Sequence, residues 1–359
     1  MRYSSIDILR TVAIVVMVLV HFAENLSGVI LPITGFGAPL FAFLSGLSYL
    51  LWVRGLEARG VSAEEISKSS IRRGLFVFGA GFAFNIFAWL PEDTFNWDVL
   101  TFIGTALLLL NGLRRLPLPI PILVAVISVL VGPLLRDMAD YQAYWVNGYF
   151  ECDWTLTDIV IGFLATGYFP IFPWVAYSIA GLVTGSMVFR AESDSTVARG
   201  PVIIGAAFMA TSGLLLWVRP SLPIQISEHL LGGWRMFPAT VEYVIGTIGM
   251  ALLLFGVAHQ FVDRNQAAAK HEGWLSIAKT FSRYSLTIYV LHHLVHMWPL
   301  WIYGIASGQE PTFYWKQALP LNYSLMLAGL FLVVCYFALR SIGPDRRWGL
   351  EGWMRWLCD

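Results

Sequence analysis

Charged residues are scarce in this chain of 359 residues. Lys, Arg, Asp and Glu together make up 13% of the sequence, whereas hydrophobic residues make up 57%. A soluble domain carries about 25% charged residues, so this composition predicts a membrane protein with several spans. The net charge is zero, which argues against nucleic acid as a partner. The first apolar run carries Asp7 and Arg10 and no small-x-small cleavage site, so we expect a retained helix rather than a signal peptide.

Cysteine motifs, phosphate-binding loops and internal repeats are also absent from the sequence. The three cysteines, Cys152, Cys335 and Cys358, have no motif spacing, which excludes a Cys-x-x-Cys zinc site and argues against internal disulfides. There is no P-loop and no G-x-G-x-x-G, so those motifs hold no phosphate here. The break at Pro170 and Pro173 has no counterpart elsewhere, which counts against an inverted-repeat transporter.

Ten apolar stretches predict membrane helices, for which about 20 apolar residues per span are typical. They lie at residues 6–26, 34–53, 73–90, 99–112, 118–135, 169–189, 200–218, 237–261, 281–302 and 321–340. The sequence therefore predicts an all-α, polytopic integral membrane protein embedded in the lipid bilayer. We expect one transmembrane domain over residues 1–340 and a short cytoplasmic tail over residues 341–359.

The loops between these helices alternate in charge. With ten helices, both ends of the chain lie on one side. Of the 23 Lys and Arg residues, all fall on that side except four, namely Arg136, Arg219, Arg235 and Lys316. The positive-inside rule therefore predicts cytoplasmic termini. The expected location is a plasma membrane, with a bacterial inner membrane favoured. Residues 155–168 are interpreted as an outer interfacial or re-entrant segment, because an extra span would remove this charge bias.

The first predicted helix carries ionisable residues inside its apolar run. Arg10 and His21 are separated by about three helical turns, so both side chains lie on one face, roughly 16 Å apart along the axis. Asp7 borders the same face. Ionisable residues within a bilayer are costly and usually functional, so this face predicts a chemical role for Arg10 and His21.

The stretch 281–302 holds a second polar stripe. Tyr289, His292 and His296 follow Ser285 at spacings of three or four residues, whereas His293 points about 100° away from His292. Depth in the membrane allows His21, His292 and His296 to meet. The alternative for any single histidine is a hydrogen bond between packed helices. No metal is expected, because the pair His292 and His296 has no Cys or acidic ligand at metal spacing.

Two further polar residues lie at a similar depth. Glu242 is about two turns from the outer end of its helix, and Asn85 occupies a comparable position. A buried carboxylate is expected to pair, and a histidine paired in this way becomes a stronger general base. A purely structural role for Glu242 is equally compatible with the sequence.

Basic residues gather at the inner end of the third helix. Arg72 and Arg73, with Lys68 and Arg10, form either a phosphate site or an anchor at anionic lipid headgroups. At the outer side, the loop 141–154 is dense in aromatic, amide and acidic side chains and includes Tyr144 and Trp145. Such a loop suits a carbohydrate acceptor, and it is equally typical of an interfacial aromatic belt.

These residues resemble a known group of membrane enzymes. Arg10 and His21, in the context Ile-Asp-Ile-Leu-Arg and His-Phe, are similar to the R-x10-H signature of the membrane acyltransferase superfamily. That superfamily includes acyltransferase-3 proteins and relatives of heparan-α-glucosaminide N-acetyltransferase. Short matches to its motifs also lie at residues 37–46, 167–177 and 285–293. Residues 22–40 contain no histidine, unlike the glucosaminide branch, so the acyltransferase-3 pattern guides the assignment of His21.

The resemblance implies an acyltransferase. It would take an acyl group, with acetyl favoured, from cytoplasmic acyl-CoA and pass it to a hydroxyl or amine of a sugar, glycolipid or cell-envelope glycan near the outer face. His21 matches the essential histidine, to act as general base or transient acyl carrier, and Arg10 would lie near the CoA phosphates with Arg72 and Arg73. His292 matches a late histidine motif and, with Glu242, is a further candidate catalytic residue. On the acceptor side we expect Asn85, Tyr289, His296, Tyr144 and Trp145.

Two other classes of protein compete with this interpretation. A proton-coupled transporter or flippase would use His21, Glu242 and His292 as a proton relay. A scaffold or sensor would need a soluble domain to receive a signal, and the sequence has none. The sequence leaves the acceptor, the acyl chain and the oligomeric state open, and a homo-oligomer is compatible with it.

Overall fold

Helices form almost the whole of the protein. The computed structural model describes residues 2–189, 199–264, 272–342 and 348–359. The long helices are α1 (Ser4–Ser27), α2 (Gly37–Glu57), α3 (Ala63–Ala88), α4 (Val99–Leu113), α5 (Pro119–Met138), α7 (Ile171–Val188), α8 (Gly200–Val218), α9 (Val241–Ala258), α11 (Ser285–Ala306) and α12 (Leu321–Ile342). The shorter ones are α6 (Leu156–Ile161), α10 (Glu272–Arg283) and α13 (Gly349–Cys358). A small hairpin joins β1 (Trp145–Val146) to β2 (Tyr149–Phe150).

The predicted all-α membrane fold is confirmed. Each of the ten predicted stretches corresponds to one long helix, and among the described residues nine helices are long and apolar enough to cross a membrane. The tenth, α11, has 22 residues, but its histidines lower its mean hydropathy below that of the others. The segment Leu156–Thr166 is helical yet shorter than the other apolar helices, in agreement with a segment that does not span the membrane on its own.

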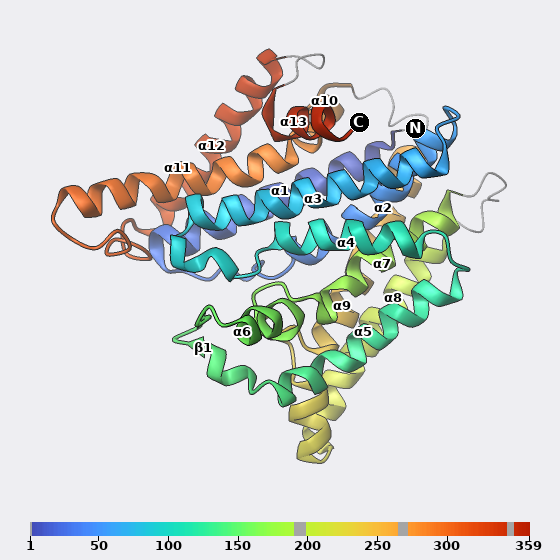
Figure 1. Cartoon of the computed structure of the whole chain (residues 1–359), viewed down its shortest axis with the longest axis horizontal. Coiled ribbons are helices and arrows are strands. Elements are labelled where there is room, and N and C mark those ends of the chain that lie inside the picture. The colour runs from blue at the N-terminus through green and yellow to red at the C-terminus, as the bar shows by residue number, and fades with distance from the viewer. Residues whose placement is uncertain (1, 190–198, 265–271, 343–347) are drawn as a thin grey trace.

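Helix α1 lies at the centre of the molecule. It contacts α2, α9, α10, α11 and α12, and Figure 1 shows it among these elements. In contrast, α5, α8 and α12 turn most of their apolar side chains outward, as expected for helices that contact lipid. The face of α1 that carries Arg10 and His21 is therefore surrounded by protein rather than by lipid.

Small residues allow the tightest helix contact in the core. A Cβ atom on Gly46 of α2 would lie 1.8 Å from the carbonyl oxygen of Ser178, and one on Gly181 of α7 would lie 1.9 Å from that of Phe43. The two backbones thus touch directly, as small residues permit between membrane helices. Trp174 and Tyr177 fill the adjoining space and are fully buried.

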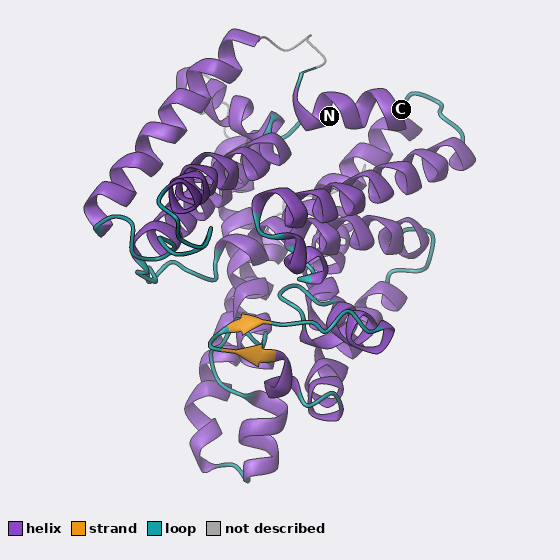
Figure 2. Ribbon diagram, turned by 60° about the vertical axis from the view of Figure 1, so that its left-hand side comes forward, coloured by secondary structure: helices purple, strands orange, loops and turns teal. Residues whose placement is uncertain are grey.

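The two amphipathic helices α10 and α13 lie near the chain termini. Figures 1 and 2 show the N and C ends close together on one side of the molecule, away from the β1–β2 hairpin. Helix α13, within the predicted tail, packs against α3 and α11. The sequence analysis predicted neither α10 nor α13 as a separate helix, because both are shorter than a membrane span.

Candidate active site

A cavity of about 1320 Å³ runs alongside α1. Its wall includes Arg10 toward one end, His21 and His293 farther along, and Glu24 and Trp315 toward the other end. The fourteen residues from Arg10 to Glu24 span about 21 Å of helix. The cavity therefore follows α1 through much of a hydrocarbon layer of about 30 Å.

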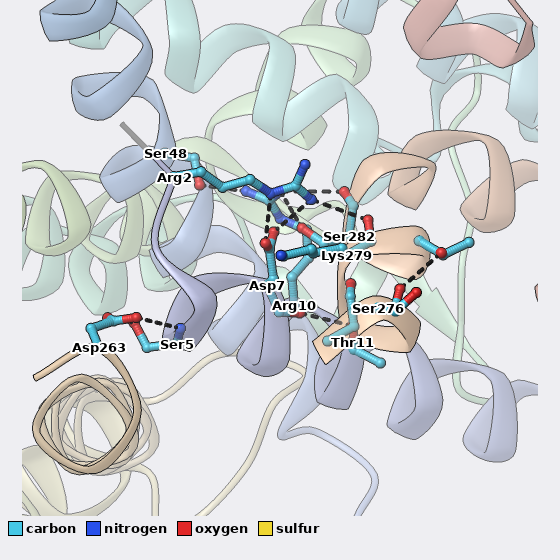
Figure 3. Close-up of polar contacts among 12 residues, drawn as sticks. Arg2, Ser5, Asp7, Arg10, Thr11, Ser48, Asp263, Ser276, Lys279 and Ser282 are labelled. Atoms are coloured by element: carbon cyan, nitrogen blue, oxygen red, sulfur yellow. Dashed lines mark hydrogen bonds and ion pairs between the residues drawn. The ribbon is translucent and has the colours of Figure 1, made fainter. Parts of the chain in front are cut away.

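One end of the cavity is built around Arg10. Its guanidinium donates hydrogen bonds to the hydroxyls of Ser282 (2.9 Å) and Ser48, which tie α1 to α10 and α2 (Figure 3). Asp7 is instead bound by Arg2, with 2.7 Å between Arg2 Nε and Asp7 Oδ2. Among the described residues, no carboxylate lies within ion-pair distance of Arg10. Its positive charge is positioned by neutral groups and is available to an anion.

The basic pair at the start of the third membrane stretch divides between two environments. Arg73 lines the cavity, where it pairs with the Asp359 side chain and lies 4.3 Å from the centre of the Trp52 ring. Arg72 is exposed and does not line the cavity. The structure thus brings Arg73, but not Arg72, to the same cavity as Arg10.

Histidines from α1 and α11 meet beside the middle of the cavity. The ring centroids of His21 and His293 are 4.5 Å apart, and those of His21 and His292 are 5.4 Å apart. Of the two α11 histidines, His293 lines the cavity and His292 is enclosed behind it. The helical spacing sets His293 about 100° from His292 around α11, and α1 packs where His21 reaches both positions.

Hydrogen bonds fix the roles of the other two α11 histidines. His292 Nδ1 donates to the Ile288 carbonyl at 3.2 Å, which leaves Nε2 as the unprotonated nitrogen in the neutral ring. His296 Nδ1 donates to the His292 carbonyl, and its Nε2 accepts from Asn25 Nδ2 at 2.9 Å. Both ring nitrogens of His296 are thereby engaged, which matches a helix-packing role rather than an acceptor-side one.

Tyr289 and Asn85 lie in the cavity wall, as their predicted acceptor-side role requires. The Tyr289 hydroxyl donates to the carboxylate of Asp98, which also caps α4 through Leu100 N at 2.7 Å. Asn85 Nδ2 donates to the Thr94 carbonyl, and its Oδ1 has no partner among the described residues. Asp98 was missed in the sequence, since its position before α4 reads as an ordinary helix cap.

Glu242 does not join the histidines. Its Oε1 accepts a hydrogen bond from Gly233 N at 3.0 Å, and the residue is absent from the cavity wall. The prediction that this carboxylate pairs with a histidine is corrected by that contact. The loop before α9 folds back over the helix and supplies the partner, which helix positions alone did not reveal.

The opposite end of the cavity is acidic and aromatic. Five carboxylates line it, namely Glu24, Glu92, Asp93, Glu151 and Asp153. The aromatic side chains beside them include Trp89, Tyr149, Trp154 and Trp315. Lys316 also lines this end and lies 3.7 Å from Glu24 Oε1. A negatively charged mouth of this kind favours a cationic or neutral polar ligand over an anionic one.

The predicted acceptor-side residues Tyr144 and Trp145 lie outside the cavity wall. Tyr144 donates to Asp158 at 2.8 Å, and Trp145 Nε1 donates to the Thr166 carbonyl at 2.8 Å. Burial and this bond to Asp158 raise the pKa of the Tyr144 hydroxyl to about 12. Both side chains thus hold the hairpin in place, while the following residues 148–154 face the cavity. The hairpin thus presents its turn, its second strand and the segment after it to the cavity, rather than Tyr144 and Trp145.

Comparison with protein families gives a match over more than half of the chain. Residues 2–224 match the model of the catalytic domain of heparan-alpha-glucosaminide N-acetyltransferase. The chain belongs to this family. A search of curated proteins returned no match.

Membership in the heparan-alpha-glucosaminide N-acetyltransferase family makes the protein a multi-pass membrane acetyltransferase. The matched region covers Arg10, His21, Arg73 and Asn85. It ends before α9, so His292 and His293 come from outside it. The structure therefore completes the cavity with helices beyond the matched region.

Proposed function

We propose that this protein transfers an acetyl group from cytoplasmic acetyl-CoA to the amine of a sugar on the opposite side of the membrane. The observation that carries this proposal is the cavity beside α1. It has cationic side chains at one end, histidines in its middle and carboxylates with aromatic rings at the other. The family membership supplies the chemistry of acetyl transfer.

Arg10 and Arg73 form the donor end in this proposal. Arg10 has no carboxylate partner within ion-pair distance among the described residues, so its guanidinium can take the CoA phosphates. The extended pantetheine arm would then follow α1 toward His21, about 16 Å away. This length is comparable to that of the arm, which would bring the thioester to the histidines.

His21 is the general base of the proposed reaction. The acceptor nitrogen attacks the thioester carbonyl, the C–S bond breaks, and His21 takes the proton that the nitrogen loses. That proton then passes to the departing thiolate, so the products are the acetamide and CoA. His293, whose two ring nitrogens have no partner among the described residues, can donate a hydrogen bond to the developing oxyanion.

The acidic mouth supports an amine as the acceptor. A protonated amino sugar would be attracted by the five carboxylates, and aromatic faces such as Trp89 and Trp315 suit the apolar face of a sugar ring. The protonated amine releases one proton to the carboxylates or solvent at the mouth before it attacks, and His21 accepts the second proton as the amide forms. The name of the family points to the same acceptor class, a glucosaminide.

The test uses purified protein in nanodiscs with labelled acetyl-CoA and glucosamine. We expect N-acetylated product from the wild type, poor donor binding by Arg10→Ala, and donor binding with a loss of kcat of about 10²–10⁴ for His21→Ala. Label that stays on the protein in the wild type, but not in His21→Ala, would replace direct transfer with an acyl-histidine route. A wild type that shows no donor binding and no turnover would refute the proposal. That result would favour proton-driven transport, which is measured as flux in vesicles.

A further inference from the structure

Three imidazole rings from two helices converge at one point. One ring nitrogen of each of His21, His292 and His293 lies within 4.8 Å of those of the other two. His292 and His293 are 0% and 1% exposed, and His21 reaches the point from the cavity side. The rings of His292 and His293 are 4.1 Å apart between centroids.

The cluster has nitrogens without protein partners. His292 Nε2 and both ring nitrogens of His293 make no hydrogen bond among the described residues. Buried polar atoms in folded proteins nearly always have a hydrogen-bond partner, so these nitrogens indicate a bound ligand. His296, one turn farther along α11, is the contrasting case, because both of its nitrogens are already engaged.

The orientation of His292 is suited to a metal ion. Its Nδ1–H is held by the Ile288 carbonyl, so the lone pair of Nε2 points toward the cluster. Histidines that bind metals almost always anchor their other nitrogen on a carbonyl or carboxylate in this manner. In the neutral ring of His293, one nitrogen carries a lone pair and can turn it toward the same point.

We propose that His21, His292 and His293 bind one divalent transition-metal ion, with Zn²⁺ as the best fit. Three neutral imidazoles favour zinc, copper, nickel or cobalt over calcium and magnesium, which prefer oxygen. A tetrahedral zinc ion with Zn–N bonds of about 2.0–2.1 Å places its ligand nitrogens about 3.4 Å apart. Small side-chain rotations would draw the present nitrogens to that spacing. The fourth position faces the cavity.

The charge of the ion has a counterpart nearby. Asp98 lines the same cavity and accepts a hydrogen bond from Tyr289, whose ring centroid is 5.7 Å from that of His292 and 6.0 Å from that of His293. A carboxylate that lines the same cavity offsets part of the cost of a buried cation. The sequence spacing gave no hint of the site, because its ligands come from α1 and from adjacent positions of α11.

The metal site goes beyond the proposed function and does not depend on it. An ion bound to His21 occupies the lone pair that would accept the proton, so metal binding and acetyl transfer exclude each other. We therefore expect Zn²⁺ to inhibit transfer and a chelator to restore it. Metal binding itself is measured without any substrate.

The experiment is a Co²⁺ and Zn²⁺ titration of the purified, chelator-treated protein in nanodiscs. We expect one metal per chain by elemental analysis and the intense visible absorption of tetrahedral Co²⁺. His293→Ala and His21→Ala should each lose that absorption. His229→Ala should retain it, because His229 is exposed and pairs with Asp137 on the outer surface.

Two results would overturn the site. One is wild-type protein that binds no more Co²⁺ or Zn²⁺ than the triple variant His21→Ala, His292→Ala, His293→Ala. The other is a Co²⁺ spectrum that survives in His21→Ala, a variant whose altered side chain faces the cavity and whose folding is checked by thermal unfolding. Acetyl transfer in the absence of metal is scored separately, so its failure leaves the metal result intact.

Discussion

The carboxylate of Glu351 accepts hydrogen bonds from both the backbone N–H and the hydroxyl of Thr287. The distances are 3.1 and 2.5 Å, and Leu286 N donates to the same carboxylate at 2.6 Å. Helix α13 thereby caps the start of α11, the helix that carries the histidines, which has no side-chain cap of its own. A carboxylate at a helix N-terminus also interacts favourably with the helix dipole.

Removal of this cap should destabilise the protein. We expect Glu351→Ala to lower stability by about 1 kcal/mol, as the loss of other helix caps does. The measurement is the thermal unfolding midpoint in nanodiscs. Glu64→Ala is the control, since Glu64 is exposed and forms an i,i+4 pair with Lys68 on the helix surface. An equal effect of the two substitutions would contradict a capping role.

The Glu351 cap also predicts a pH dependence. Burial raises the pKa of its carboxyl above the usual value, against the opposite effect of the hydrogen bonds it accepts. Its contribution to stability is therefore greatest below the ordinary Glu pKa of about 4.3 and declines as the pH rises through the higher folded-state pKa. Relative to Glu351→Gln, the thermal unfolding midpoint of the wild type should fall as the pH increases. A constant difference across the acidic and neutral range would refute this.

Arg73 and Arg72 provide a matched test of the donor end. Arg73 lines the cavity and its neighbour is exposed, so Arg73→Ala should weaken acetyl-CoA binding by about tenfold or more, as expected for the loss of a charged hydrogen-bond donor. Arg72→Ala should leave it nearly unchanged. Calorimetric titration of the purified protein measures both. Equal losses would show that general surface charge, rather than the cavity, attracts the donor.

His293, which lines the cavity, should differ kinetically from His296, which does not. His293→Ala should reduce kcat by about 10²–10³ through loss of oxyanion stabilisation, with donor binding preserved. His296→Gln should retain most of the activity, because His296 serves Asn25 and a backbone carbonyl. Steady-state rates at saturating acetyl-CoA check both values. The proposed role of His293 fails if its variant is as active as His296→Gln.

Cys152 reports on the orientation in the membrane. It lies in the segment after the hairpin and is partly exposed, whereas Cys335 and Cys358 are buried. A membrane-impermeant maleimide added to intact cells should label the protein, and Cys152→Ser should abolish the label. Burial raises the pKa of the Cys152 thiol, so labelling should accelerate as the pH increases. Labelling only after permeabilisation would invert the proposed topology.

The sequence was sufficient to predict the fold because membrane helices are encoded locally. Apolar run length located all ten long helices, and the turn count on α1 correctly placed Arg10 and His21 on one cavity wall. The partners of those residues could not be predicted in the same way. Periodicity specifies a face of a helix but not the rotation of one helix against its neighbour, which decides between His292 and His293. The role of Glu351 depends on the docking of α13, a contact between distant parts of the chain.

The low hydropathy of α11 has a consequence for how the protein is made. During synthesis, a segment with three histidines partitions poorly into lipid from the translocon. By the time it emerges, α1 and α3 are already in place and offer His21, Asn25 and Phe84 as neighbours. Entry of α11 into the bilayer is then coupled to assembly with those helices. Substitutions that weaken the contact between α1 and α11 would therefore reduce the amount of mature protein as well as its turnover. Rates measured for such variants should be normalised to the folded fraction.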